Sequence, residues 1–120
     1  CCLIPGVESM SENIEVISVV DKFLEHTRVF IFCNSNEPKV YISSADFMTR
    51  NIENRVEVTC PIYDNDIKQE LLDTFEICWS DNQKARIIDK NQKNQYKINN
   101  LPKVRSQVET YNYYLKKLED

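Results

Sequence analysis

The chain has 120 residues, of which 42% are hydrophobic and 28% are charged, and its formal net charge is −4. These totals are ordinary for one folded domain with a single core, and they exclude a disordered or fibrous chain. The acidic balance argues against a dedicated nucleic-acid binder, and no apolar run approaches the ~20 residues needed to cross a bilayer.

The chain opens with Cys1 and not with methionine, and residues 1–6 have the pattern of a buried strand that ends in a turn. We therefore expect a piece of a longer polypeptide. No signal-type segment opens the sequence, which favours a cytoplasmic protein, with peripheral association to a membrane left open. The five cysteines are odd in number and lack Cys-x-x-Cys spacing, so we expect reduced, mostly buried thiols and neither a disulfide nor a zinc site.

The first half of the chain predicts strands and short helices in turn. Residues 14–20 favour a strand that passes into a short helix with one apolar face. That face would hold Val19, Val20, Phe23 and Leu24. Strands are expected at 28–33 and 39–43, joined by turn residues 34–38, and a short helical pattern follows at 49–54.

Residues 55–61 alternate between apolar and polar side chains and predict a strand that Pro61 stops. An amphipathic helix is expected to begin near Asp66, with Asp64 or Asn65 as its cap, and to end at residues 80–82.

Two short strands are predicted at 84–89 and 95–98 around a polar turn, and the last helix is expected after Pro102. Its apolar stripe would consist of Val104, Val108, Tyr111, Leu115 and Leu118. The fold class that follows is α/β, a single domain with a mixed β-sheet flanked by helices.

Polar side chains gather at the ends of three predicted strands. His26, the only histidine, and Arg28 stand at the head of one strand. The two following strands contribute Ser43, Ser44, Asp46 and Glu57. Neighbouring strands would bring these ends to one sheet edge, where a histidine beside cations suits phosphoryl transfer.

Each of these residues also has a simpler interpretation. A lone histidine is more often a surface or capping residue, and Ser-Ser-Ala-Asp at 43–46 is often only a helix N-cap. Arg50 and Arg55 could belong to solvated faces, and Glu57 could lie on the wet face of its strand. Only the joint pattern indicates a phosphate site.

A basic strip runs from residue 81 to residue 105, with seven basic side chains against two acidic ones. Such a strip can steer an anionic ligand toward one face of an acidic domain. A solvated hairpin is the favoured interpretation, and a non-catalytic module that binds a polyanion is the alternative.

Several stretches resemble the C-terminal part of the bacterial polyphosphate kinase family. The longest are residues 24–28, 40–51 and 54–58, and the shorter ones are residues 1–6, 11–14, 81–86 and 103–105. The resemblance spans nearly the whole chain. It implies that residues 1–120 are the C-terminal catalytic domain of such an enzyme.

That family is similar in fold to the phospholipase D superfamily, whose half-sites join a His-x-Lys strand, a Gly-Ser-x-Asn strand and a later glutamate. This chain matches them with residues 26–28, residues 43–46 and Glu57. In the superfamily the late acid hydrogen-bonds the histidine, so Glu57 would orient His26. Arg28 replaces the lysine and Asp46 replaces the asparagine, which argues against plain phosphodiesterase activity. A phosphodiesterase or nuclease half-site that dimerises is the alternative.

The resemblance implies reversible transfer of the γ-phosphate of ATP to inorganic polyphosphate, with magnesium and through a phosphohistidine. The phosphorylated histidine belongs to a preceding domain, so His26 would be the assisting catalytic histidine, with Glu57 beside it. Phosphate oxygens would be held by His26, Arg28, Ser43, Ser44, Asp46, Arg50 and Arg55.

The chain has no glycine-rich phosphate loop, because Gly6 is its only glycine. We therefore expect an inactive half-site. Its partners would be the preceding domain of the same polypeptide, inorganic polyphosphate, and further copies in a homo-oligomer, with no nucleic acid.

Overall fold

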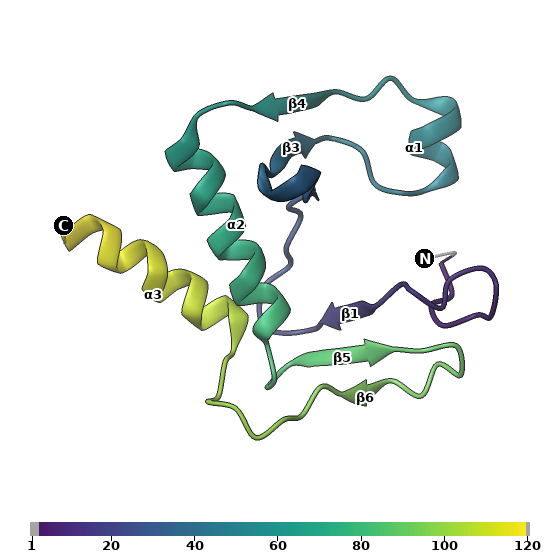
Figure 1. Ribbon diagram of the computed structural model, residues 1–120. Coiled ribbons are helices and arrows are strands. Elements are labelled where there is room, and N and C mark those ends of the chain that lie inside the picture. Colours follow the sequence, from purple (N-terminus) through teal and green to yellow (C-terminus); the bar gives the residue numbers. More distant parts are fainter. Residues whose placement is uncertain (1–2, 120) are drawn as a thin grey trace. The chain divides into compact units, whose positions relative to one another are not determined.

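The computed structural model describes residues 3–119 (Figure 1). Its elements are, in chain order, β1 (Val16–Val19), β2 (Val29–Phe32), a 3-10 helix η1 (Asn34–Asn36), β3 (Lys39–Ser43), α1 (Thr49–Asn54), β4 (Thr59–Ile62), α2 (Asn65–Ser80), β5 (Ala85–Ile88), β6 (Gln95–Tyr96) and α3 (Ser106–Glu119). The described residues divide into two compact units, one of residues 25–73 and one of residues 3–24 with 74–119.

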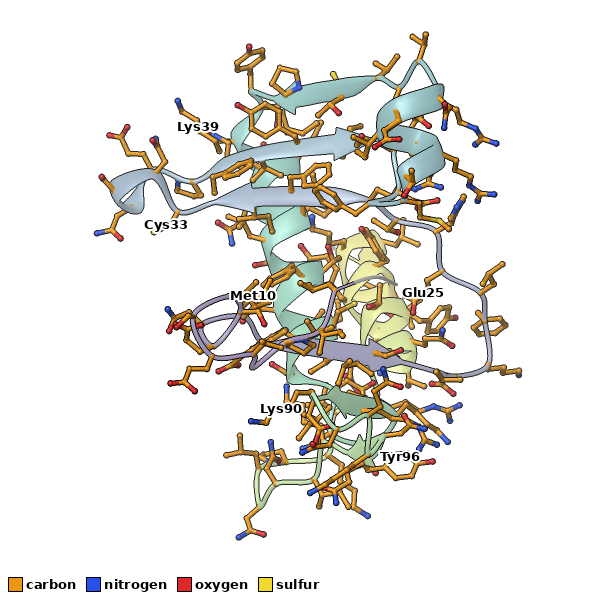
Figure 2. The ribbon with its side chains drawn as sticks, turned by 90° about the vertical axis from the view of Figure 1, so that its right-hand side faces the viewer. Met10, Glu25, Cys33, Lys39, Lys90 and Tyr96 are labelled. Atoms are coloured by element: carbon orange, nitrogen blue, oxygen red, sulfur yellow. The ribbon has the colours of Figure 1, made fainter. Side chains whose placement is uncertain are left out.

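The unit of residues 25–73 contains an antiparallel sheet with the strand order β2-β3-β4. The predicted hairpin between β2 and β3 is confirmed, and its turn η1 has positive φ angles of 45°, 56° and 69° at Asn34, Ser35 and Asn36. Asparagine tolerates this region better than other residues with a side chain. Figure 2 shows Cys33 and Lys39 on either side of the turn. Val40, in the central strand, is 1% exposed and marks the core.

The strand β4 differs from its prediction at both ends. It begins at Thr59 instead of Arg55, and it continues through Pro61 to Ile62. The strand β4 is an edge strand, and Pro61 pairs with Tyr41 of β3. Because no strand of this sheet lies on its other side, the missing N–H of Pro61 costs no hydrogen bond there. Glu57 therefore lies in the segment before the strand.

The other unit contains an antiparallel sheet with the order β1-β5-β6. Val16 pairs with Ile88 and Val19 pairs with Ala85, which is 0% exposed. The two strands predicted after residue 83 are confirmed in shorter form as β5 and β6. Since both sheets are antiparallel, the prediction of one mixed sheet was wrong.

The short helix predicted after residue 18 does not form. Residues 16–19 form β1, and Val20, Phe23 and Leu24 are 65%, 64% and 99% exposed. Two causes favour the extended chain: β-branched residues pack well in strands, and the backbone of Phe23 is held by the side-chain amide of Gln107 at 2.9 and 2.7 Å.

The strand predicted at the start of the chain is not formed by Leu3 and Ile4, the part of it that the structure describes. Cys1 and Cys2 lie outside the described residues, and Leu3 and Ile4 are 45% and 47% exposed. The turn expected at their end is present at Gly6, whose φ of 75° suits a residue without a Cβ.

Two predictions about burial were wrong. Cys33 and Cys60 are exposed and Cys78 is half-buried, so the described cysteines are less buried than predicted. The apolar stripe predicted for the last helix is largely exposed, with exposed fractions of 41% to 84% for Val108, Tyr111, Leu115 and Leu118.

Candidate phosphate site

The register of the sheet in residues 25–73 brings the start of β2, the end of β3 and the start of β4 to one edge. Val29 pairs with Ile42, and Ser43 pairs with Thr59. In an antiparallel sheet the start of one strand lies beside the end of its neighbour. The expectation that the polar strand ends meet at one edge is therefore confirmed.

Arg28 is the centre of the first cluster at this edge. Its Nε and Nη2 donate to the two carboxylate oxygens of Asp46 at 2.5 and 3.1 Å. Its Nη2 also contacts Nε2 of His26. The hydrogen bonds from Arg28 hold the pKa of Asp46 below its usual range, and the positive charges of Arg28 and Arg50 lower it further. Asp46 therefore stays ionised and anchors the guanidinium.

The contact between Arg28 and His26 decides where the imidazole carries its proton. A guanidinium donates hydrogen bonds and cannot accept them, so a hydrogen bond in this contact requires the tautomer of His26 whose proton is on Nδ1. Among the described residues the two N–H groups of Arg28 Nη1 have no partner. These N–H groups and the Nδ1–H of His26 are free to meet an anion.

Glu57 is the centre of the second cluster. The hydroxyl of Ser44 donates to its Oε2, and Nδ2 of Asn51 donates to its Oε1 at 2.8 Å. These hydrogen bonds, with nearby Arg55 and Arg28, hold the pKa of Glu57 below its usual range. Glu57 is therefore a fixed, ionised carboxylate.

The direct hydrogen bond expected between Glu57 and His26 is not formed within residues 3–119. The oxygens of Glu57 accept from Ser44 and Asn51, and the imidazole is engaged by Arg28 instead. Glu57 acts on Arg28 by Coulombic attraction, so its link to the histidine passes through the guanidinium.

The other predicted phosphate ligands fall into two groups. The hydroxyl of Ser43 accepts the N–H of Ala45 at 3.1 Å and shares a 2.9 Å hydrogen bond with Thr59, so it closes the turn after β3. Arg50 and Arg55 are exposed, and their guanidinium groups have no hydrogen bond or ion pair within the described range. The two arginines are open to an anion, whereas the serine hydroxyl is occupied.

The interpretation of residues 43–46 as a helix N-cap does not hold. The cap of α1 is Met48, and no side chain bonds to the first turn of the helix. The segment is instead held by packing: the ring of Phe47 meets that of Phe30 edge-on, with centroids 5.3 Å apart. This contact fixes the chain next to Asp46 against β2.

Asn51 is a site residue that the sequence pattern does not single out. It is 3% exposed, and it is the buried residue of the short helix α1. A six-residue helix shows too little periodicity to reveal a buried position. The sequence shows only that Asn51 is polar, and a buried polar residue needs a hydrogen-bond partner. Only the structure identifies that partner as Glu57.

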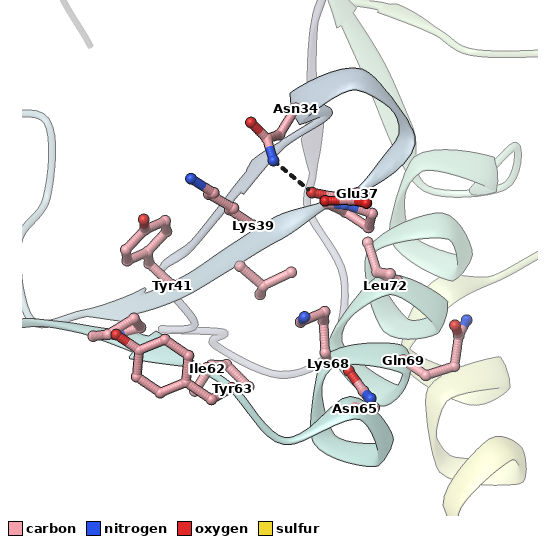
Figure 3. A pocket seen from close by; sticks show the side chains of 13 residues that line it. Asn34, Glu37, Lys39, Tyr41, Ile62, Tyr63, Asn65, Lys68, Gln69 and Leu72 are labelled. Carbon is pink, nitrogen blue, oxygen red and sulfur yellow. Dashed lines mark hydrogen bonds between the residues drawn. The ribbon is translucent and has the colours of Figure 1, made fainter.

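A cavity of about 710 Å³ lies at the other end of β3 (Figure 3). Lys39 and Tyr41 line it from β3, and Lys68 and Leu72 line it from α2. None of the predicted site residues lines this cavity. The clusters around Arg28 and Glu57 therefore lie outside this cavity.

The basic strip between residues 81 and 105 is partly neutralised within its own unit. Arg105 donates to both carboxylate oxygens of Asp21 at 2.6 and 2.7 Å. The guanidinium of Arg86 lies 4.1 Å from the ring centroid of Tyr96. Because Arg105 and Arg86 already contact protein groups, the strip is less suited to binding a polyanion than its charge suggests.

A family model described as "Polyphosphate kinase C-terminal domain 2" matches residues 1–107. The chain belongs to the polyphosphate kinase family. The polyphosphate kinase of Vibrio parahaemolyticus is 53% identical to it over 120 residues, covering 99% of this chain and 17% of the relative. The polyphosphate kinase of Escherichia coli strain K12 is 52% identical, with the same coverage of both chains. The chain thus spans about a sixth of the length of these polyphosphate kinases.

A solved structure agrees with the sequence comparisons. The crystal structure of the polyphosphate kinase from Porphyromonas gingivalis matches with a TM-score of 0.93 and 43% identity, covering 99% of this chain and 18% of that one. The family resemblance inferred from residues 24–28, 40–51 and 54–58 is therefore confirmed, and this fold of helices and antiparallel sheets is shared with a polyphosphate kinase.

The magnesium implied by the polyphosphate kinase resemblance finds no ligand set in the described part of the chain. Residues 3–119 contain no group of three His, Cys, Asp or Glu side chains that could hold a metal ion. The carboxylates of Asp46 and Glu57 already accept hydrogen bonds from Arg28, Ser44 and Asn51. These residues therefore do not fit a magnesium site.

A helix needs about 20 predominantly apolar residues to cross a bilayer. Among the described residues, no helix is both long enough and apolar enough to cross a membrane.

Proposed function

We propose that this chain supplies one wall of the active site of a polyphosphate kinase, which transfers the γ-phosphate of ATP reversibly to inorganic polyphosphate. In that reaction the bond between the γ-phosphorus and the bridging oxygen of ADP breaks, and a bond to a terminal polyphosphate oxygen forms. The observation that carries the proposal is the position of Arg28, which joins His26 to Asp46 at the sheet edge.

Phosphoryl transfer asks a protein mainly for positioned positive charge and hydrogen-bond donors. The free N–H groups of Arg28 and the Nδ1–H of His26 would contact phosphate oxygens, with Arg50 and Arg55 adding charge. Because two hydrogen bonds to Asp46 fix the guanidinium and Glu57 attracts it electrostatically, it needs little reorganisation when an anion arrives.

His26 has the assisting role in this proposal. Its imidazole would contact phosphate and move a proton, while the phosphoryl group would be carried by a histidine in a preceding domain. Glu57 would act on His26 through Arg28. Asp46, Ser43 and Ser44 would hold the wall together, since each is occupied by protein partners and a carboxylate repels phosphate.

The broader setting of the proposal follows from the family. Residues 1–120 would be the second of two phospholipase D-like domains, inactive alone and completed by the preceding domain in a cytoplasmic homo-oligomer. ATP and polyphosphate would be the substrates. Magnesium would have to be bound outside the carboxylates of this wall, and no step is assigned to it.

The test is His26→Ala in the full-length polypeptide that carries this chain, with polyphosphate synthesis from ATP as the measurement. We expect the rate to fall by about 100-fold or more, the usual cost of losing an acid–base group. Thr27→Ala is the matched control, since Thr27 is the exposed neighbour. A near-wild-type rate for His26→Ala would remove the proposed role.

A further inference from the structure

Asn51 is a buried amide beside an exposed reaction surface. It is 3% exposed, and its Nδ2 donates to Oε1 of Glu57 at 2.8 Å. Burying a polar group costs free energy unless it is hydrogen-bonded, so this contact compensates for the burial of the Nδ2 donor. The position of α1 is thereby linked to the position of the carboxylate. The Oδ1 atom of Asn51 has no hydrogen-bond partner among residues 3–119.

The Glu57 carboxylate depends on side chains for its position. Residues 55–58 belong to no helix or strand. The backbone is tied at Val58, whose C=O accepts the N–H of Ser44 at 3.0 Å and whose N–H donates to the Ser44 hydroxyl at 3.0 Å. The carboxylate itself is held by Ser44 and Asn51. Loss of the amide would leave one hydrogen-bonding side chain to fix it.

We propose that Asn51 is a positioning residue of the phosphate site: its amide fixes the Glu57 carboxylate beside Arg28, and through Arg28 it fixes the imidazole of His26. The proposal rests on the function proposed above, which supplies the reaction that these side chains serve. Asn51 acts through Glu57 and is separated from the substrate by it.

The electrostatics of the cluster agree with this role. The charged groups acting on Glu57 are Arg55 and Arg28, and both favour its ionised form. The hydrogen bonds from Ser44 and Asn51 favour it further and lower its pKa. Without the amide, Glu57 should bind a proton more readily and release part of its hold on the guanidinium.

The experiment compares Asn51→Leu with Asn54→Leu in the full-length polypeptide. Leucine branches at the same carbon as asparagine, is larger and has no donor, and Asn54 is exposed at the end of the same helix. For Asn51→Leu we expect kcat/KM for polyphosphate synthesis to fall about tenfold or more, because a displaced catalytic group reacts poorly. The acid limb of its pH profile should move to higher pH. Asn54→Leu should leave kcat/KM and the acid limb of the pH profile unchanged.

A second measurement separates this inference from the proposed function. Nuclear magnetic resonance of isotope-labelled glutamate follows the titration of the Glu57 carboxyl without requiring turnover. We expect its pKa to rise in Asn51→Leu, and in the smaller variant Asn51→Ala if the leucine variant does not fold. An unchanged titration in a folded variant would overturn the role of Asn51, whereas an active His26→Ala would overturn the proposed function alone.

Discussion

Arg28 shows how one side chain can organise a site that looks, in sequence, like a row of independent phosphate ligands. Its guanidinium has five N–H donors, two of which bond Asp46 while a third contacts His26. The planar fork is needed for this geometry, because a lysine ammonium cannot present two parallel donors to a carboxylate. The Asp46 carboxylate thus supports the cation, and in the proposed function it contributes to the site in this way.

The variant Asp46→Asn tests this support. The amide cannot accept both N–H groups of Arg28, so the guanidinium should lose its fixed orientation and the kcat/KM of the full-length polypeptide should fall by about tenfold or more. Steady-state kinetics of polyphosphate synthesis would measure it. Glu53→Gln, an exposed acid on α1, is the control and should keep the wild-type value.

Because hydrogen bonding to Arg28 lowers the pKa of Asp46, its carboxylate is charged at any pH above the ordinary value of 3.8. The ion pair between Arg28 and Asp46 is therefore intact above pH 3.8 and is lost only as the pH falls below that value. An Asp46→Asn variant with unaltered kinetics at neutral pH would contradict the supporting role.

At the scale of elements, α2 (Asn65–Ser80) begins and ends close to its predicted positions. The carboxylate of Asp64 accepts the N–H groups of Asp66 and Ile67 at 2.9 and 3.0 Å, which is the expected N-cap. The helix ends at Ser80, at the predicted boundary. Cap residues and apolar periodicity act locally, so they can be recognised without knowing the tertiary structure.

The variant Asp64→Ala removes the cap. We expect the first turn of α2 to lose about 1 kcal/mol of stability, because two backbone N–H groups lose their acceptor. Hydrogen exchange at the amides of Asp66 and Ile67 would detect the faster opening. Asp64→Ser should restore most of the protection, and equal protection in the alanine variant would show that the cap contributes little.

At the scale of the whole molecule, Asp81 connects three segments of the unit that contains α3. Its Oδ1 accepts N–H groups of Gln83, Lys84 and Ala85, and its Oδ2 accepts that of Ser106 at 2.7 Å. Burial alone would raise the pKa of Asp81, but these backbone hydrogen bonds outweigh it and lower the pKa to about 2. The start of β5 and the start of α3 therefore share one carboxylate.

This carboxylate predicts a dependence on pH. Its folded pKa of about 2 lies below the ordinary value of 3.8, so the ionised form stabilises the folded unit. The stabilisation is complete above the ordinary pKa and is lost as the pH falls toward 2. Amide protection at Ser106 and Ala85 should decline over that range, and a constant protection would contradict the assignment.

The variant Asp81→Asn tests this carboxylate. It replaces one of the two accepting oxygens with an NH2 group, which cannot accept a hydrogen bond from a backbone N–H. We expect a loss of about 2 kcal/mol in local stability at neutral pH, measured as hydrogen exchange at Ser106. Asp89→Asn is the control, because Asp89 bonds the N–H groups of Asn91 and Lys93 in an exposed turn. That change should leave Ser106 protected.

By itself, the sequence determined which polar strand ends would meet. The hairpin between β2 and β3 and the helix α2 follow from turn residues, caps and periodicity, and these local signals suffice to place His26, Arg28 and residues 43–46 at one edge. Only the tertiary structure decided which side chains bond each other. Glu57 lies outside the predicted strand and bonds Asn51, since hydrogen-bond partners depend on the path of a segment without secondary structure.

The difference between local signals and long-range contacts also explains the largest error in the predicted elements. Residues 16–19 carry a pattern that suits a strand or the start of a helix, and the choice was made by pairing with β5, which lies far along the chain. Backbone pairing between distant segments leaves no trace in a local window of sequence. Local chemistry thus determined which residues could form the site, and long-range pairing and hydrogen bonding decided how they are held.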